Sequence, residues 1–113
     1  MEILKEKIKK ADLLKAQCIF EDGPMVKAVA DVDKNILAID SELHADLEKM
    51  LLENGSAQEN LWGFNLYPEE AEEYFIEYDS MINVRPRQGN RSRDVESEEV
   101  RAKIVEVVKS WVE

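Results

Sequence analysis

The chain has few of the residues that build redox and metal sites. Cys18 is its only cysteine and His44 its only histidine among 113 residues. A single cysteine excludes an intramolecular disulfide, a CxxC redox motif and a tetrahedral thiolate site. The same scarcity fits a reducing compartment, so we expect a cytoplasmic protein that needs neither a metal nor a cofactor.

Long apolar runs are also missing. No uninterrupted apolar run exceeds about four residues, whereas a helix that spans a membrane needs about 20. The amino-terminal residues alternate lysine with apolar residues and do not show the core of a signal peptide. We therefore expect no membrane partner. The length fits a single domain, residues 1–113, that folds without a disulfide or a metal.

Positive charge is scarce in most of the chain. The formal net charge is −10, and from Ala28 to Val84 fourteen acids face two lysines, which gives a local net charge of −12. Such an acidic stretch repels a phosphate backbone, which argues against nucleic acid as a partner. The exception is RPRQGNRSR, residues 85–93, which holds four of the five arginines and no acid. We call this segment the arginine loop.

The arginine loop is the main candidate site, because guanidinium groups match carboxylates and phosphates with planar, paired donors. It contains neither GxxxxGK nor GxGxxG. The arginines could clamp the protein's own acids, such as Glu69–Glu73 or those from Asp94 onward. They could instead bind an anionic ligand such as a nucleotide, or an acidic patch on a partner protein. The candidate ligand-binding residues are Arg85, Arg87, Asn90, Arg91 and Arg93.

His44 is the candidate catalytic residue if the protein is an enzyme. It lies near the start of an expected helix, with Glu48 one turn further on. Its imidazole could act as a general base oriented by Asp46 or Glu48, while the arginine loop holds a phosphate or carboxylate of the substrate. A surface histidine in a local hydrogen bond is the simpler interpretation, because no motif supplies a nucleophile or a pocket.

A calcium-binding pattern is present but incomplete. Four oxygen-bearing residues match positions 1, 3, 5 and 12 of an EF-hand loop, namely Asp31, Asp33, Asn35 and Glu42. The sharp turn at position 6 of such a loop normally requires glycine, and this chain has Ile36 there. The flanking alternation also predicts strands where the motif needs an entering helix. We therefore predict no metal site.

Apolar periodicity predicts the order helix-strand-strand-helix-strand-strand-helix. We expect helices at about 9–20, at 41–53 with Ser41 as N-cap, and at 97–111 with Ser97 as N-cap. We expect strands at 25–32, 35–40, 61–67 and 74–84. The fold class is then α+β, a small antiparallel sheet of about four strands in two pairs, packed by about three helices largely on one side. An edge strand or the last helix could also mediate a homodimer.

The chain contains the stretches VKAVADVDKNILAI, ELHADLEKMLLENGS, LWGFNLYPEE and MINVRPRQGNRS, in this order. Together they resemble a family of short prokaryotic proteins catalogued only as a domain of unknown function. The resemblance runs from about Met25 to Trp111 and implies no activity, cofactor or catalytic residue. The chain departs from the family at Asp40 and Ser41, where the relatives carry glycines.

These observations together favour a cytoplasmic binding or interaction module whose arginine loop receives an anionic ligand or an acidic partner. A small enzyme with His44 as general base is the alternative. RNA binding through the arginine loop is a second alternative, and it requires a steep dependence of affinity on salt.

Overall fold

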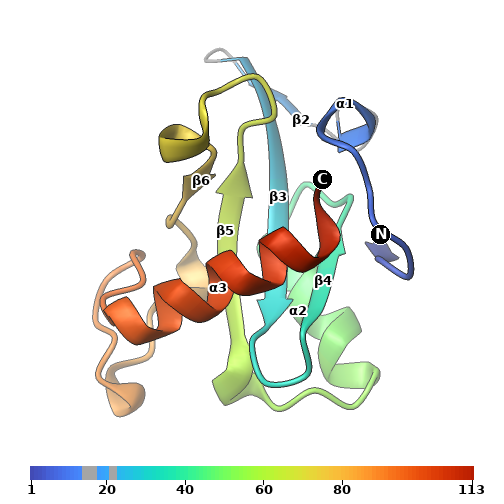
Figure 1. Cartoon of the computed structure of the whole chain (residues 1–113). Helices are drawn as coiled ribbons and strands as arrows, with labels where there is room; N and C mark the ends of the chain where they lie inside the picture. Colours follow the sequence, from blue (N-terminus) through green and yellow to red (C-terminus); the bar gives the residue numbers. More distant parts are fainter. Residues whose placement is uncertain (14–17, 21–22) are drawn as a thin grey trace.

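The computed structural model describes residues 1–13, 18–20 and 23–113, which form an α+β fold (Figure 1). The helices in this part of the chain are α1 (Lys10–Leu13), α2 (His44–Glu53) and α3 (Glu98–Trp111). The strands are β1 (Glu2–Ile3), β2 (Cys18–Phe20), β3 (Gly23–Asp31), β4 (Ile36–Ile39), β5 (Leu61–Leu66) and β6 (Ile76–Glu77). Five strands lie side by side in the order β1-β4-β3-β5-β6, β2 pairs with the start of β3, and every pair is antiparallel.

Strands β3 and β4 form the predicted hairpin, and Asp31 shapes its turn. The Asp31 carboxylate accepts hydrogen bonds at 2.9 Å from the backbone N–H groups of Asp33 and Lys34. It also accepts one at 2.6 Å from the hydroxyl of Ser56. Asn35 closes the turn with a φ of 56°, a left-handed conformation that asparagine tolerates. The carboxylate at the first position of the calcium-binding pattern is therefore occupied within the turn.

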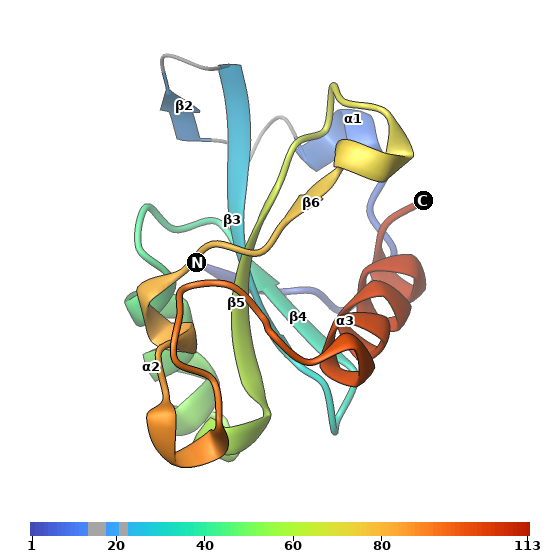
Figure 2. The same ribbon diagram turned by 90° about the vertical axis from the view of Figure 1, so that its left-hand side faces the viewer.

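The two longer helices cover opposite faces of the sheet, as Figure 2 shows with α2 and α3 on either side of the strands. Helix α2 packs Leu47 and Leu51 against one face, and α3 packs Ile104, Val107 and Val108 against the other. The expectation that the helices lie largely on one side is therefore wrong.

Strand β5 shows why both faces of the sheet need cover. All six of its residues are buried. Leu61 belongs to the cluster under α2, whereas Trp62, Phe64 and Leu66 belong to the larger cluster under α3. Because successive side chains of a strand point to opposite faces, an unbroken buried strand requires a layer on each side.

The predicted end of the first helix is wrong, because its last residues form a strand. The periodicity of the sequence predicted a helix at about 9–20, but α1 ends at Leu13 and Cys18–Phe20 form strand β2. Residues 14–17 of the predicted helix lie outside the described residues. Isoleucine and phenylalanine favour strands, and pairing with β3 from Cys18↔Met25 to Phe20↔Gly23 replaces the last turn of the predicted helix.

Helix α2 begins after a sharp turn and not at the predicted cap. Its first residue is His44, and its N-cap position, Leu43, makes no side-chain capping bond. Ser41 is therefore not the N-cap; its hydroxyl accepts a hydrogen bond from the backbone N–H of Leu43 at 3.2 Å. Asp40 has a φ of 72°. A φ in this left-handed region favours glycine over aspartate.

Helix α3 confirms its prediction. The Ser97 hydroxyl accepts a hydrogen bond from the backbone N–H of Val100 at 3.2 Å and caps the helix. Glu98 and Glu99 follow in the first turn, where the helix dipole favours acids. Among the described residues, no helix has the length and apolar character needed to cross a bilayer.

The strand predicted at 74–84 is mostly absent. Strand β6 covers only Ile76–Glu77, which pair with Asn65 and Leu66 of β5. The chain then leaves the sheet and forms a 3₁₀ turn at Met81–Asn83. Tyr74 is exposed and Asn83 is fully buried. The alternation of residues 74–84 predicts the reverse, with Tyr74 on the buried face and Asn83 on the solvent face. The side chain of Asn83 makes the hydrogen bonds to the edge of β5 that the missing strand would have made.

Candidate functional site

The amide of Asn83 replaces a backbone partner for the outer edge of β5. Gly63 donates its backbone N–H to Oδ1 of Asn83 at 2.9 Å, and Nδ2 of Asn83 donates to the Gly63 carbonyl at 2.8 Å. The same Nδ2 donates to the carbonyl of Arg93 at 3.0 Å. Because Asn83 is 0% exposed, these bonds satisfy polar groups that water does not reach. They fasten both ends of the arginine loop to the sheet.

Gly63 is required at this junction by close approach. A Cβ atom at Gly63 would lie 2.6 Å from Oγ and 2.8 Å from Cβ of Ser80, which is itself buried. These distances are shorter than any normal contact. Any side chain at this position would push the segment around Ser80 away from β5 and break the Asn83 bonds.

Arg85 is bound by backbone carbonyls and an aromatic ring. Its guanidinium donates to the carbonyls of Gln58 and Leu61 and lies 4.1 Å from the centre of the Trp62 ring. Burial lowers the pKa of Arg85 from its ordinary value, and the charge of Glu48 opposes this shift. Stacking and fork-like donation are the interactions that distinguish arginine from lysine. Arg85 therefore ties the start of the arginine loop to β5.

The side-chain amide of Asn90 forms hydrogen bonds to backbone groups in and beside the arginine loop. Its Nδ2 donates to the carbonyls of Asn83 at 2.7 Å, Ser92 at 3.1 Å and Asp94 at 2.7 Å, and its Oδ1 accepts from the N–H of Glu96 at 2.9 Å. The backbones of Arg85 and Asn90 also pair, with an N–H donated in each direction. Asn90 is 4% exposed. It orders the loop from inside, and its amide has no face toward solvent.

Arg93 pairs with an acid of this chain. Its Nε lies 2.6 Å from Oδ1 of Asp79, in an exposed ion pair. Outside the loop, Arg101 forms a similar pair with Asp94 at 2.6 Å and lies 4.7 Å from the centre of the Tyr78 ring. Within the described residues no ion pair joins the acids of Glu69–Glu73 to the arginine loop, so the internal pairing that the sequence allowed is seen at Arg93 with Asp79 and not with this run.

Arg87 and Arg91 differ from the other loop arginines. Both are exposed, and within the described residues neither guanidinium has a hydrogen bond or an ion pair. The backbone N–H of Arg91 does bond to Oε2 of Glu96 at 2.8 Å, as do the N–H and hydroxyl of Ser92 at 2.9 and 2.8 Å. These bonds, the Ser92 hydroxyl first, lower the pKa of Glu96, and the nearby charge of Arg91 adds to this shift. The loop backbone is thus held while two guanidinium groups face solvent.

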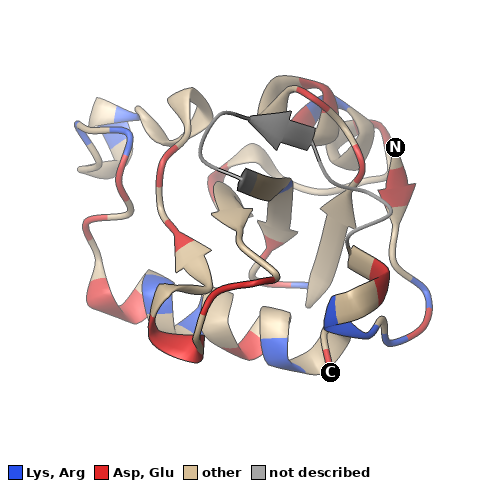
Figure 3. Cartoon of the chain, turned by 90° about the horizontal axis from the view of Figure 1, so that it is seen from above, with Lys and Arg blue, Asp and Glu red and all other residues tan. Residues whose placement is uncertain are grey.

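The charge distribution sets these two arginines apart. Figure 3 shows acids spread along the whole chain, with the basic arginine loop at one end of the molecule. The formal net charge of the chain is −10. Two guanidinium groups without an ion pair to the described residues form a local region of positive potential on this acidic protein, and physiological salt screens that potential over about 8 Å.

His44 is buried and bonded to the sheet. It is 7% exposed, and its Nε2 lies 2.8 Å from the carbonyl oxygen of Phe64. A carbonyl can only accept, so Nε2 carries the proton. Burial lowers the pKa of His44, although the Phe64 carbonyl opposes the shift. In the described structure His44 makes no hydrogen bond to Asp46 or Glu48, the two residues expected to orient it in an enzyme.

One cavity of about 270 Å³ borders the arginine loop at Gln88, Gly89 and Asn90, but the candidate arginines and His44 line none of the four cavities described here. These four cavities have volumes between about 270 and 540 Å³. Within residues 1–13, 18–20 and 23–113, no three of the histidine, cysteine and acidic side chains are placed to hold a metal ion. None of these four cavities connects the loop arginines to His44, although the charges of Arg93 and Asp79 act on the pKa of His44 in opposite directions.

Gly63 and Asn83 are the structural residues that sequence reasoning missed. Gly63 interrupts an apolar strand, and an isolated glycine in a strand signals close approach of another segment. Asn83 sits where alternation predicts a solvent-facing position. Only the contact between the two, which lie 20 residues apart, reveals their role.

Comparison with known proteins gives a family without an activity. No curated protein and no solved structure matches the chain. A family model described as "Protein of unknown function (DUF5674)" matches residues 2–111. This match covers nearly the whole chain, including the arginine loop and the strand that it contacts. The chain therefore belongs to the DUF5674 family of proteins of unknown function.

Proposed function

We propose that the protein is a cytoplasmic interaction module whose arginine loop binds an acidic surface of a partner protein. One observation carries this proposal: the chain occupies Arg85 and Arg93 internally and leaves Arg87 and Arg91 with their guanidinium groups in solvent. The two free arginines are the groups that a carboxylate on another molecule can reach.

The order of the loop supports a binding role. Asn83 and Asn90 hold the loop backbone through buried hydrogen bonds, and Glu96 holds it from outside. A loop fixed in this way loses little conformational entropy when a partner binds, so more of the contact free energy appears as affinity.

The shape of the site favours a protein surface over a small anion. The cavity of about 270 Å³ beside the loop is lined by Gln88, Gly89 and Asn90 and by no arginine, whereas the side chains of Arg87 and Arg91 are exposed at the surface. RNA is disfavoured because its long phosphate backbone would also meet Glu96, Glu98 and Glu99, which are exposed beside the loop. A protein surface can present a few carboxylates at the loop alone.

The enzymatic alternative gains no support from the geometry. The Nε2 proton of His44 is engaged by the Phe64 carbonyl, and His44 lines none of the four cavities. A general base needs an accessible lone pair within reach of its substrate. The binding role therefore stands as the better proposal.

A short oligoglutamate peptide tests the proposal by nuclear magnetic resonance titration of the labelled protein. We expect shift changes confined to the arginine loop, and an affinity about tenfold weaker in the double variant Arg87→Ala/Arg91→Ala. The matched control is Lys7→Ala/Lys9→Ala, which removes the same charge from another exposed basic segment. Equal weakening in both variants, or shifts outside the loop, would contradict the proposal.

Two further arms separate the other partners. An oligouridylate that binds more tightly than the peptide, with a steep salt dependence, would favour RNA over a protein partner. A second copy of this chain is one candidate for the acidic partner, because the acidic residues of Glu69–Glu73 are exposed. A monomeric mass by light scattering at high concentration would remove the homodimer and leave a different protein as partner.

A further inference from the structure

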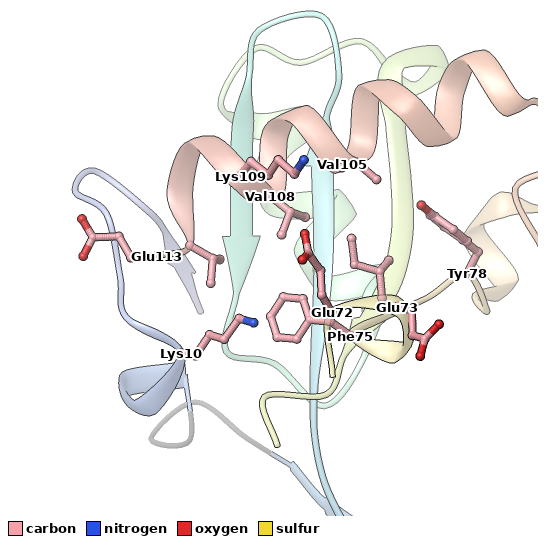
Figure 4. A pocket seen from close by; sticks show the side chains of 11 residues that line it. Lys10, Glu72, Glu73, Phe75, Tyr78, Val105, Val108, Lys109 and Glu113 are labelled. Carbon is pink, nitrogen blue, oxygen red and sulfur yellow. The ribbon is translucent and has the colours of Figure 1, made fainter. Parts of the chain in front are cut away.

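A second candidate site lies away from the arginine loop. A cavity of about 410 Å³ opens between α3, α1 and the segment that leads into β6 (Figure 4). None of the loop residues lines it. Sites that enclose small organic molecules have volumes of roughly 300–1,000 Å³, so this cavity has room for a small ligand.

The floor of the cavity is apolar and continuous with the core. Phe75, Val108 and Val112 line it and belong to the larger hydrophobic cluster. Ile76 and Val105 line it as well and are half-buried. Because these side chains are fixed by packing against the sheet and α3, the floor offers a preformed apolar surface.

Charged groups of both signs stand at the mouth. Figure 4 shows Lys10, Lys109 and Glu72 pointing toward the opening, whereas Glu73 and Glu113 point away from it. Nζ of Lys10 lies 4.6 Å from the centre of the Phe75 ring. In the described structure, the side chains of Lys109 and Glu72 have no hydrogen bond or ion pair. Glu73 and Glu113 also line the cavity, so the groups that face the opening are two ammonium groups and one carboxylate, with two further carboxylates directed outward.

Tyr78 adds a hydrogen-bond donor to the wall. Its ring lines the cavity, and burial raises the pKa of its hydroxyl, an effect that the nearby Arg101 opposes. The hydroxyl therefore keeps its proton at neutral pH and can donate to an oxygen atom of a ligand.

We propose that this cavity binds a small organic carboxylate whose body is an aromatic ring or a branched alkyl group. The carboxylate of the ligand lies between Lys10 and Lys109 and pairs with their ammonium groups, which point toward the opening. The body packs against Phe75, Val105 and Val108. This inference is independent of the proposed function, because it concerns different residues and a different class of ligand.

Three probes with one apolar body test the proposal: phenylpropionate, phenylpropanol and phenylpropylamine. Each is titrated into the labelled protein, and shifts are followed at the cavity residues. We expect phenylpropionate to bind about fivefold more tightly than phenylpropanol, and phenylpropylamine to bind most weakly. An amine that binds as tightly as the carboxylate would overturn the proposal, as would shifts outside the cavity or no binding by any probe.

Three variants locate the site. Lys10→Gln/Lys109→Gln should remove the preference for the carboxylate while leaving the affinity for phenylpropanol unchanged. Lys103→Gln removes an exposed lysine from another part of α3 and should change neither affinity. Val105→Trp fills the cavity and should abolish binding of all three probes. A thermal unfolding midpoint for each variant confirms that it folds, and a folded Val105→Trp protein that still binds would overturn the proposal.

Discussion

Replacement of Asn83 by alanine tests how the arginine loop is attached to the sheet. The change removes an amide that makes three buried hydrogen bonds, two to Gly63 and one to Arg93. The backbone groups of these two residues stay in place but lose their partner. The loop and β5 then have no direct polar link at this position.

The expected loss of stability is large. A lost hydrogen bond is worth about 1 kcal/mol, and each buried group left unsatisfied adds further desolvation, so three such groups give about 4 kcal/mol in total. This is a substantial part of the roughly 5–15 kcal/mol that stabilises a typical domain. For a chain of this size it corresponds to a melting temperature lower by about 16 °C.

Urea denaturation followed by circular dichroism and tryptophan fluorescence measures the change. Asn60→Ala is the matched control, because the Asn60 side chain is half-buried and makes no hydrogen bond to the described residues. We expect the control to lose less than about 0.5 kcal/mol. A loss below about 1.5 kcal/mol in Asn83→Ala would refute the view that its amide substitutes for a strand.

Four other predictions follow from the same contacts. Gly63→Ala should lower the free energy of unfolding by about 2 kcal/mol through the clash with Ser80, measured by urea denaturation. Arg85→Lys should lose about 2 kcal/mol in the same assay, because lysine cannot bond both carbonyls and stack on the ring; an unchanged midpoint would contradict this. Asp40→Gly should raise the melting temperature by relieving the φ of 72°, a gain of up to about 1 kcal/mol. Burial lowers the pKa of His44 in the folded protein, so the unfolded chain binds the His44 proton more tightly than the folded chain does. The free energy of unfolding is therefore highest above the ordinary pKa of 6.5 and falls as the pH drops below it. His44→Gln should lose the part of the decline that sets in below the ordinary pKa of 6.5, and an identical slope in both proteins would count against a buried neutral imidazole.

Local patterns predicted the parts of the fold that local interactions determine. The hairpin of β3 and β4, strand β5 and helix α3 follow from alternation, turn residues and the Ser97 cap. Each of these signals lies within the element that it specifies. Their agreement with the structure shows that periodicity and tertiary packing favour the same conformation there.

The remaining parts depend on contacts between distant residues. The segment around Met81–Asn83 alternates like a strand, but the Asn83 amide, and not its backbone, bonds to Gly63. At Cys18–Phe20, pairing with β3 competes with helical spacing and prevails. The placement of helices on both faces depends on the burial of every residue in β5, which alternation alone does not reveal.

The sequence alone could not predict which arginines of the loop are bound within the chain and which are exposed. The sequence places many acids near the loop, so charge complementarity suggested carboxylates as internal partners. Arg85 instead donates to two carbonyls, acceptors that every residue carries and that no sequence pattern marks. Arg87 and Arg91 are distinguished from their neighbours only by what the folded loop leaves uncovered.

The most direct test of the account is a resonance spectrum of the arginine side-chain N–H groups in the free protein. We predict slowly exchanging, well-dispersed guanidinium signals for Arg85 and Arg93, because each is held by acceptors of this chain. Arg87 and Arg91 should exchange rapidly and lie at the position of free arginine. Protected signals from Arg87 or Arg91 in the absence of a partner would contradict the claim that these two groups are available to bind one.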